Sequence, residues 1–147
     1  MEIPAKIKIP LCIEQGCVFN FFLDFDDSKR ESKNRYFVVL NANPKTDIVL
    51  IMLTSTTQIE KKYEFVRKAG ISEDTIVKVT PQEYSVFTHE SVFNCNDVFE
   101  IEMKDLIRKI EENGNMDYRK ISESIIKRLV SGIKKSPKVA ENLKKLL

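Results

Sequence analysis

Short apolar runs separated by polar segments dominate the first two thirds of the chain. The runs rich in aromatic and β-branched residues, or alternating between apolar and polar positions, are residues 16–25, 36–40, 47–54, 75–79, 91–93 and 98–101. Runs of this length and composition favour strands over helices. The polar Asn-Cys-Asn-Asp between the last two runs predicts a tight turn. The pattern therefore predicts about six short strands.

The segments between these runs predict turns and loops. Residues 41–45 (NANPK) favour a hairpin between their neighbouring runs, and residues 26–34 predict an exposed, charged loop. Residues 64–70 predict a turn-rich connection. Because no segment of helical period separates the strands, a parallel α/β architecture is disfavoured, and a small barrel or sandwich is predicted.

Helical periodicity begins only after the last predicted strand. Residues 104–112 place Leu106 and Ile110 on one face, and Asn113-Gly114 supplies a stop. From residue 117 onwards an apolar residue recurs at every fourth position, at Ile121, Ile125, Leu129 and Ile133. We therefore divide the chain into an N-terminal extension (1–15), a β-rich domain (16–114) and a basic helical extension (115–147), whose apolar stripe packs on the domain or on a partner subunit.

Composition indicates a globular protein with one core. The 147 residues are 42% hydrophobic and 31% charged. No apolar run resembles a signal peptide or is long enough to cross a bilayer, so we expect a cytoplasmic protein without a membrane partner. Cys12, Cys17 and Cys95 are odd in number and not spaced as metal ligands, which disfavours a disulfide scaffold or a zinc site.

Charge is unevenly distributed. Residues 117–147 carry nine Lys or Arg against three acidic residues, a net charge of +6, so the preceding residues carry −4 of the total of +2. The basic face of the last helix has two interpretations, phosphate contact or an ordinary solvated helix surface.

The candidate chemistry is narrow. With four glycines and one histidine, the chain contains neither a Gly-rich phosphate loop nor a two-histidine acid–base pair. A Thr-Ser-Thr-Thr-Gln cluster at 54–58 follows an apolar run, where such side chains cap a helix or donate hydrogen bonds to phosphate. Arg35 precedes the strand at 36–40, where a guanidinium would suit phosphate at the rim of a sheet. Each feature alone also fits an ordinary turn or a solvated strand end.

In their order along the chain, these features resemble the MazF/PemK family of toxin endoribonucleases. Gly16-Cys17-Val18 is similar to the family's opening Gly-Asp-Val/Ile, and residues 35–40 (RYFVVL) are similar to its Arg-Pro-x-x-Val-x segment. Thr56-Thr57-Gln58 resembles the family's Thr-(Thr/Ala)-Gln motif. Further on, Glu90-Ser91-Val92 resembles its Asp-Ser-Val strand, and Asp105-Leu106 resembles the acidic-Leu start of its late helix. The resemblance covers residues 16–111. Three departures are Tyr36 in place of the proline, a loop at 26–34 without the family's glycines, and an insertion or altered strand at 80–87.

The resemblance implies an α+β fold built on a small SH3-like β-barrel of the CcdB/PemK type, followed by the C-terminal helices. It also implies a metal-independent, cofactor-free endoribonuclease toxin of a type II toxin–antitoxin system. Its substrate would be single-stranded RNA, cut by attack of the ribose 2′-hydroxyl on the adjacent phosphorus. A homodimer and a cognate antitoxin peptide are the implied protein partners.

The same resemblance assigns catalytic residues. Arg35 would stabilise the charge that grows on the phosphoryl oxygens, because a guanidinium stays protonated and is a poor base. Thr56 would donate a hydroxyl hydrogen bond to the same phosphate, with Thr54 and Ser55 as alternates.

The general base and the RNA contacts are less closely defined. His89 and Glu31 are the candidate bases, and histidine is the residue type whose ordinary pKa lies nearest neutrality. Gln58, Lys61 and Lys33 are the candidate RNA contacts. The alternative function is a non-catalytic SH3-like module that binds RNA or a protein partner.

Overall fold

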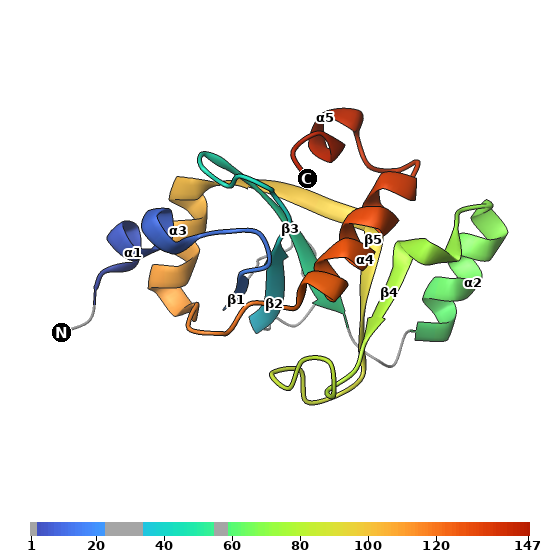
Figure 1. Ribbon diagram of the computed structural model, residues 1–147, viewed down its shortest axis with the longest axis horizontal. Coiled ribbons are helices and arrows are strands. Elements are labelled where there is room, and N and C mark those ends of the chain that lie inside the picture. Colours follow the sequence, from blue (N-terminus) through green and yellow to red (C-terminus); the bar gives the residue numbers. More distant parts are fainter. Residues whose placement is uncertain (1–2, 23–33, 55–58) are drawn as a thin grey trace.

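The computed structural model describes residues 3–22, 34–54 and 59–147. Its centre is one five-stranded sheet in the order β1-β2-β3-β5-β4, in which every neighbouring pair is antiparallel (Figure 1). The strands are β1 (Val18–Phe22), β2 (Asn34–Val39), β3 (Asp47–Thr54), β4 (Ile76–Val79) and β5 (Ser91–Glu102). The predicted α+β class and the hairpin at 41–45 are confirmed.

The sheet is open. β1 and β4 form its two edges, and no described residue of one pairs with the other. The closed barrel of the sequence prediction is therefore not formed by the described strands. Helices cover both apolar faces, so the sheet buries its side chains without closing on itself.

Helix α4 (Glu123–Lys135) covers one face of the sheet. The side chain of Ser122 caps its first turn by accepting a hydrogen bond from the Ile125 amide at 3.3 Å. Leu129 and Ile133 are buried with Val49 and Phe93 of the sheet. The predicted apolar stripe is thus buried against the sheet of its own chain, and α5 (Glu141–Lys144) follows it (Figure 1).

The opposite face is covered by helices from both ends of the domain. Helix α3 (Met103–Asn113) confirms the helix predicted at 104–112, and it buries Leu106 and Ile110. Helix α1 (Ala5–Cys12), which the sequence did not predict, adds Ile9 to the same cluster. Phe21 and Phe37 stack beneath them with ring centroids 4.1 Å apart.

The turn-rich connection predicted at 64–70 is wrong. Helix α2 (Ile59–Ala69) occupies this place, and the short helix η2 (Glu73–Thr75) follows. Gly70 ends α2 with a φ of 71°, a conformation that favours glycine. Val66 and Ile71 pack on Ile76 of β4. The helical spacing of Ile59, Tyr63 and Val66 was the signal for this helix, although charged residues surround it.

The two strands predicted at 91–93 and 98–101 are one strand. In β5, the partner of Ile51 is Val98 whereas the partner of Leu53 is Phe93, so residues 94–97 bulge from the ladder with β3. The strand stays continuous because Asn94 pairs with β4. The predicted turn is therefore wrong, although its polar residues do mark the irregularity.

Residues 80–90 connect β4 to β5 and are anchored by aromatic side chains. Tyr84 and Phe87 are 1% and 2% exposed, with their rings 4.7 Å apart. The Tyr84 hydroxyl donates a hydrogen bond to the Arg119 carbonyl at 2.6 Å. The ring centroid of Tyr36 lies 5.2 Å from that of Phe87, so Tyr36 helps to hold this connection in place.

Within the described ranges, no helix is both long and apolar enough to cross a membrane.

Candidate functional site

The candidate site lies at the end of the sheet where Arg35 is located. The strand termini at this end are Phe22 of β1, Asn34 of β2, Thr54 of β3, Val79 of β4 and Ser91 of β5. Phe22, Asn34 and Thr54 therefore lie at the same end of the sheet as the connection 80–90. Antiparallel strands bring these sequence-distant positions together.

A cross-strand row of register positions runs along this end. Arg35 pairs with Phe21 on one side of β2, and Val92 of β5 pairs with both Thr54 and Lys78. The β2–β3 ladder ends at Phe37 opposite Met52, so each strand continues by two residues beyond that pair, to Arg35 on β2 and to Thr54 on β3. Arg35 and Thr54 therefore lie at the same end of two neighbouring strands.

Arg35 is half-buried and shares its face of the sheet with Phe21. Among the residues that the structure describes, no carboxylate forms an ion pair with it. The packed strand holds its backbone, while no described acidic group neutralises its guanidinium. This is the arrangement that an arginine needs to bind a phosphate.

His89 and Lys61 occupy exposed positions near the same end. His89 lies two residues before β5, and its carbonyl accepts a hydrogen bond from the Ser91 hydroxyl at 2.9 Å. Lys61 is in the first turn of α2, which begins five residues after Thr54. The predicted residues Thr56, Ser55, Gln58, Glu31 and Lys33 lie outside the described residues.

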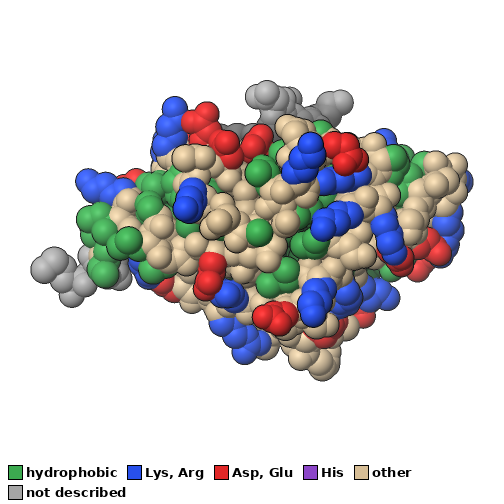
Figure 2. All heavy atoms as spheres, turned by 45° about the horizontal axis from the view of Figure 1, so that its top comes forward, with side chains coloured by type: hydrophobic (Ala, Val, Ile, Leu, Met, Phe, Trp, Pro, Cys, Tyr) green, Lys and Arg blue, Asp and Glu red, His purple; other side chains and the backbone are tan. Residues whose placement is uncertain are grey.

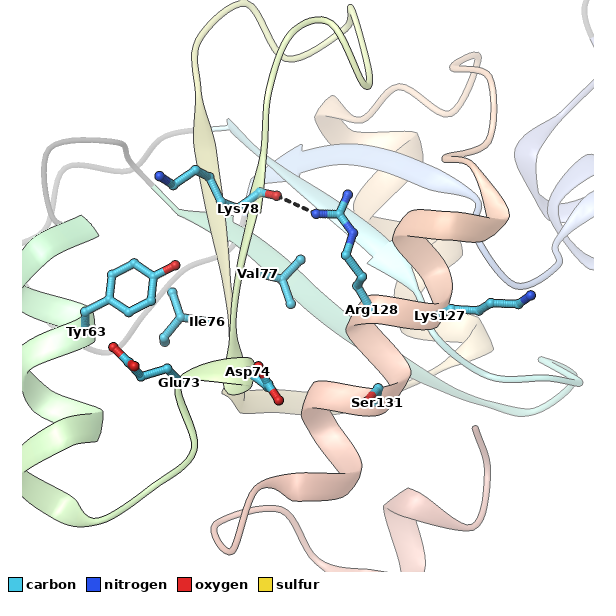
Figure 3. Close-up of a pocket in the computed structure, with 9 residues that line it drawn as sticks. All are labelled: Tyr63, Glu73, Asp74, Ile76, Val77, Lys78, Lys127, Arg128 and Ser131. Atoms are coloured by element: carbon cyan, nitrogen blue, oxygen red, sulfur yellow. Dashed lines mark hydrogen bonds between the residues drawn. The ribbon is translucent and has the colours of Figure 1, made fainter.

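A hollow that the sequence did not predict lies between α2, β4 and α4, apart from the strand ends described above. It has a volume of about 580 Å³, and Lys127, Arg128 and Tyr63 are among its lining residues (Figure 3). Arg128 reaches across it and donates a hydrogen bond to the Lys78 carbonyl at 3.0 Å. Opposite charges are nearly balanced here through the pairs Arg128–Glu83, Lys135–Asp74 and Arg67–Glu73. The hollow therefore lacks the charge that would select an ionic ligand.

Cys95 and Cys17 do not form a nucleophilic site. Burial raises the pKa of Cys95 to about 12, and burial also raises the pKa of Cys17. Since the thiolate is the reactive form, such thiols are poor nucleophiles. Within the described parts of the chain, no group of three or more His, Cys, Asp or Glu side chains could hold a metal ion.

Compared with known proteins, the sequence matches no protein-family model and no curated protein. Conclusions about its function therefore come from the geometry of its own residues.

Proposed function

We propose that this protein is a metal-independent endoribonuclease that cleaves single-stranded RNA. The observation that supports the proposal is the antiparallel pairing of β2 and β3, whose ladder ends at Phe37–Met52 and leaves Arg35 and Thr54 at the same end of the sheet. A phosphate between these two positions would meet a guanidinium and the first residue of a hydroxyl-rich segment. His89 lies on the connection that enters the sheet at the same end.

The proposed reaction uses the RNA's own 2′-hydroxyl. Its oxygen forms a bond to the adjacent phosphorus, the bond from phosphorus to the 5′-oxygen breaks, and a 2′,3′-cyclic phosphate remains. The 2′-hydroxyl proton passes to a base, and the leaving 5′-oxygen gains a proton. Negative charge grows on the phosphoryl oxygens, and Arg35 stabilises it through charge-assisted hydrogen bonds.

The other roles are those that the resemblance to the MazF/PemK family implies. Thr56 donates a hydroxyl hydrogen bond to the scissile phosphate, with Thr54 or Ser55 as alternates. His89 or Glu31 accepts the 2′-hydroxyl proton. Gln58, Lys61 and Lys33 contact the RNA on either side of the cut, and Lys61 is exposed as this role requires.

The toxin assignment belongs to the same proposal. The protein would act in the cytoplasm as a homodimer and be neutralised by an antitoxin peptide, with an opened form of the SH3-like barrel as its fold. The exposed apolar stripe of α1 supports the homodimer, since Ile7 and Leu11 are 50% and 79% exposed.

A second candidate, a non-catalytic module that binds RNA or a protein, is favoured by one observation. Tyr36, which replaces the family's proline, packs against Phe87 and Tyr118 at 5.2 and 5.5 Å. This cluster lies on the α4 face of the sheet, opposite to the face that Arg35 shares with Phe21, so Tyr36 has a packing role at a position of the resembling motif.

The test is cleavage of single-stranded RNA in excess EDTA by wild type, Arg35→Ala and Arg35→Lys. We expect wild-type cleavage to yield a cyclic phosphate, and Arg35→Ala to lose roughly a hundredfold to a thousandfold in rate. Arg35→Lys retains the charge without the planar fork, so its rate should lie between the two.

The matched control is Arg108→Ala. Arg108 is exposed on α3 and pairs with Asp105 at 3.1 Å, so its loss removes an equal charge and should leave cleavage unchanged. Circular dichroism establishes that each variant is folded. Wild-type protein that binds RNA but leaves it intact would establish the non-catalytic candidate, and equal rates for wild type and Arg35→Ala would remove Arg35 from the mechanism.

A further inference from the structure

Helix α4 presents a row of lysine and serine side chains to solvent on its side away from the sheet. The members of this Lys–Ser row, all exposed, are Ser124, Lys127, Ser131 and Lys134. The two lysines are seven residues apart, so they lie on one side of the helix about 10 Å from each other. Figure 2 shows Lys and Arg side chains spread over one face of the molecule, with Asp and Glu side chains among them. Each of these side chains of the row is of a type that can donate hydrogen bonds, and none is acidic.

Ion pairs distinguish the row from the basic residues beside it. The flanking pairs are Arg128–Glu83, Lys135–Asp74 at 2.5 Å and Lys120–Glu14 at 3.1 Å. Among the residues that the structure describes, no carboxylate lies within ion-pair distance of Lys127 or Lys134. Arg128 and Lys135 tie α4 to neighbouring elements through these pairs, whereas Lys127 and Lys134 are exposed and have no such partner among the described residues.

The surface beside the row is hollowed on the side of Lys134, whereas the acidic Glu14 and Glu123 line a separate depression at the Lys127 end. A depression of about 570 Å³ is lined by Lys127, Lys134 and Lys135 together with Ser131 and apolar residues of α4. The neighbouring hollow between α2, β4 and α4 contains nearly balanced charges, so the positive character belongs to this depression and the row.

The shape and chemistry of this surface favour a polyanion over a protein partner. Protein interfaces depend on buried aromatic or large apolar anchors at their centre. The large hydrophobic side chains that are exposed within the described residues are Ile3, Ile7, Leu11, Phe65 and Leu146, and none of them is on α4. Ammonium and hydroxyl donors at regular spacing instead match phosphodiester oxygens.

We propose that the Lys–Ser row of α4 binds the sugar–phosphate backbone of single-stranded RNA. The choice of RNA rests on the proposed function. α4 covers the face of the sheet opposite to the one that Arg35 shares with Phe21, so the row is a binding surface separate from the cleavage site. It adds affinity for RNA and takes no part in bond breaking.

The experiment measures binding without cleavage. A fluorescent RNA of about 20 nucleotides, 2′-O-methylated throughout to block 2′-hydroxyl attack, is titrated with the full chain in EDTA at several salt concentrations. Wild type is compared with Lys127→Glu/Lys134→Glu and with the control Lys6→Glu/Lys45→Glu. The control lysines are exposed on α1 and in the β2–β3 turn, and the two double variants have the same net charge.

We expect the row variant to bind the RNA at least roughly tenfold more weakly than the control variant does. The slope of log affinity against log salt concentration should also be smaller in the row variant by about 1.4, because it loses two phosphate contacts to a single strand. Equal binding by the two double variants, or no binding by wild type, would overturn the proposal. Tighter binding of a polyglutamate peptide of equal charge would also overturn it, in favour of an acidic protein partner. Cleavage of unmodified RNA is scored separately, so a wild type that binds but does not cut contradicts only the nuclease proposal.

Discussion

At the scale of single residues, Tyr84 fixes the connection 80–90 to the end of the sheet that carries the candidate site. Its ring is 1% exposed, and the guanidinium of Arg119 lies 5.3 Å from the ring centroid. Burial raises the pKa of its hydroxyl to about 12 from an ordinary value of 10. The folded state thus holds this proton at pH values where the unfolded chain releases it.

Alkaline pH should therefore destabilise the protein through Tyr84. The contribution of Tyr84 is fully present below pH 10 and declines by roughly 1.4 kcal/mol per pH unit between its unfolded and folded pKa values. Tyr84→Phe should remove this part of the pH dependence, and it should cost about 1 kcal/mol at neutral pH because the Arg119 carbonyl loses its donor. Urea unfolding of both proteins at pH 8 and pH 11 measures the two effects. The same loss of stability at high pH in both would show that other groups cause it.

The sequence predicts only part of the setting of Arg35. Its place before a strand and its suitability for phosphate follow from the sequence. Its location at the same end of the sheet as Thr54 does not, because that depends on which strands pair and in what direction.

At the scale of elements, helix α4 makes a close backbone approach to η2 at Gly132. A Cβ atom on Gly132 would lie 2.6 Å from the Asp74 carbonyl oxygen and 2.8 Å from the sulfur of Cys95. The first of these atoms is backbone and cannot rotate away. Glycine at this position therefore allows α4 to approach η2 and β5.

Gly132→Ala should destabilise the fold by about 1–3 kcal/mol, because the added methyl group forces the backbones apart. The matched control is Ser131→Ala, on the exposed side of the same helix turn, which should change stability by less than about 0.5 kcal/mol. Urea unfolding at neutral pH measures both. If the two variants are equally stable, close packing at Gly132 is not a constraint on the fold.

The elements that the sequence predicts correctly have apolar residues that repeat at a clear helical or strand spacing, and the elements that it misses do not. The stripe from Ile125 to Ile133 is wholly apolar and predicts α4. Helix α2 has the same spacing but only a narrow apolar face, which meets β4 and β5 after folding. β5 remains one strand through its polar residues because β4 supplies a pairing partner there.

At the scale of the whole molecule, the C-terminal segment is part of the core. Ile121, Ile125, Leu129 and Ile133 belong to one buried cluster with Val38, Val49, Ile51 and Phe93 of the sheet. Without α4, that face of the sheet would be exposed to water. The basic tail in the sequence is the outer side of a helix whose inner side the sheet requires.

A chain that ends at residue 114 should therefore fail to fold cooperatively, because burial of this face supplies much of its hydrophobic stabilisation. Near-ultraviolet circular dichroism and urea unfolding should show no fixed aromatic environment and no sigmoidal transition. Removal of residues 141–147 alone is the control, since α5 has no fully buried residue and its loss should lower the midpoint while leaving the transition cooperative. A cooperative transition in the 1–114 chain would show that the sheet is a separate domain.

The sequence by itself determined the β-rich class, the hairpin at 41–45 and the helices predicted at 104–112 and after residue 117, because these depend on local composition and period. Only the tertiary structure decided that the sheet is open, that α4 completes its core, and that Arg35 and Thr54 lie at the same end of neighbouring strands. Each of these depends on contacts between residues far apart in the chain, and local preference does not specify such contacts.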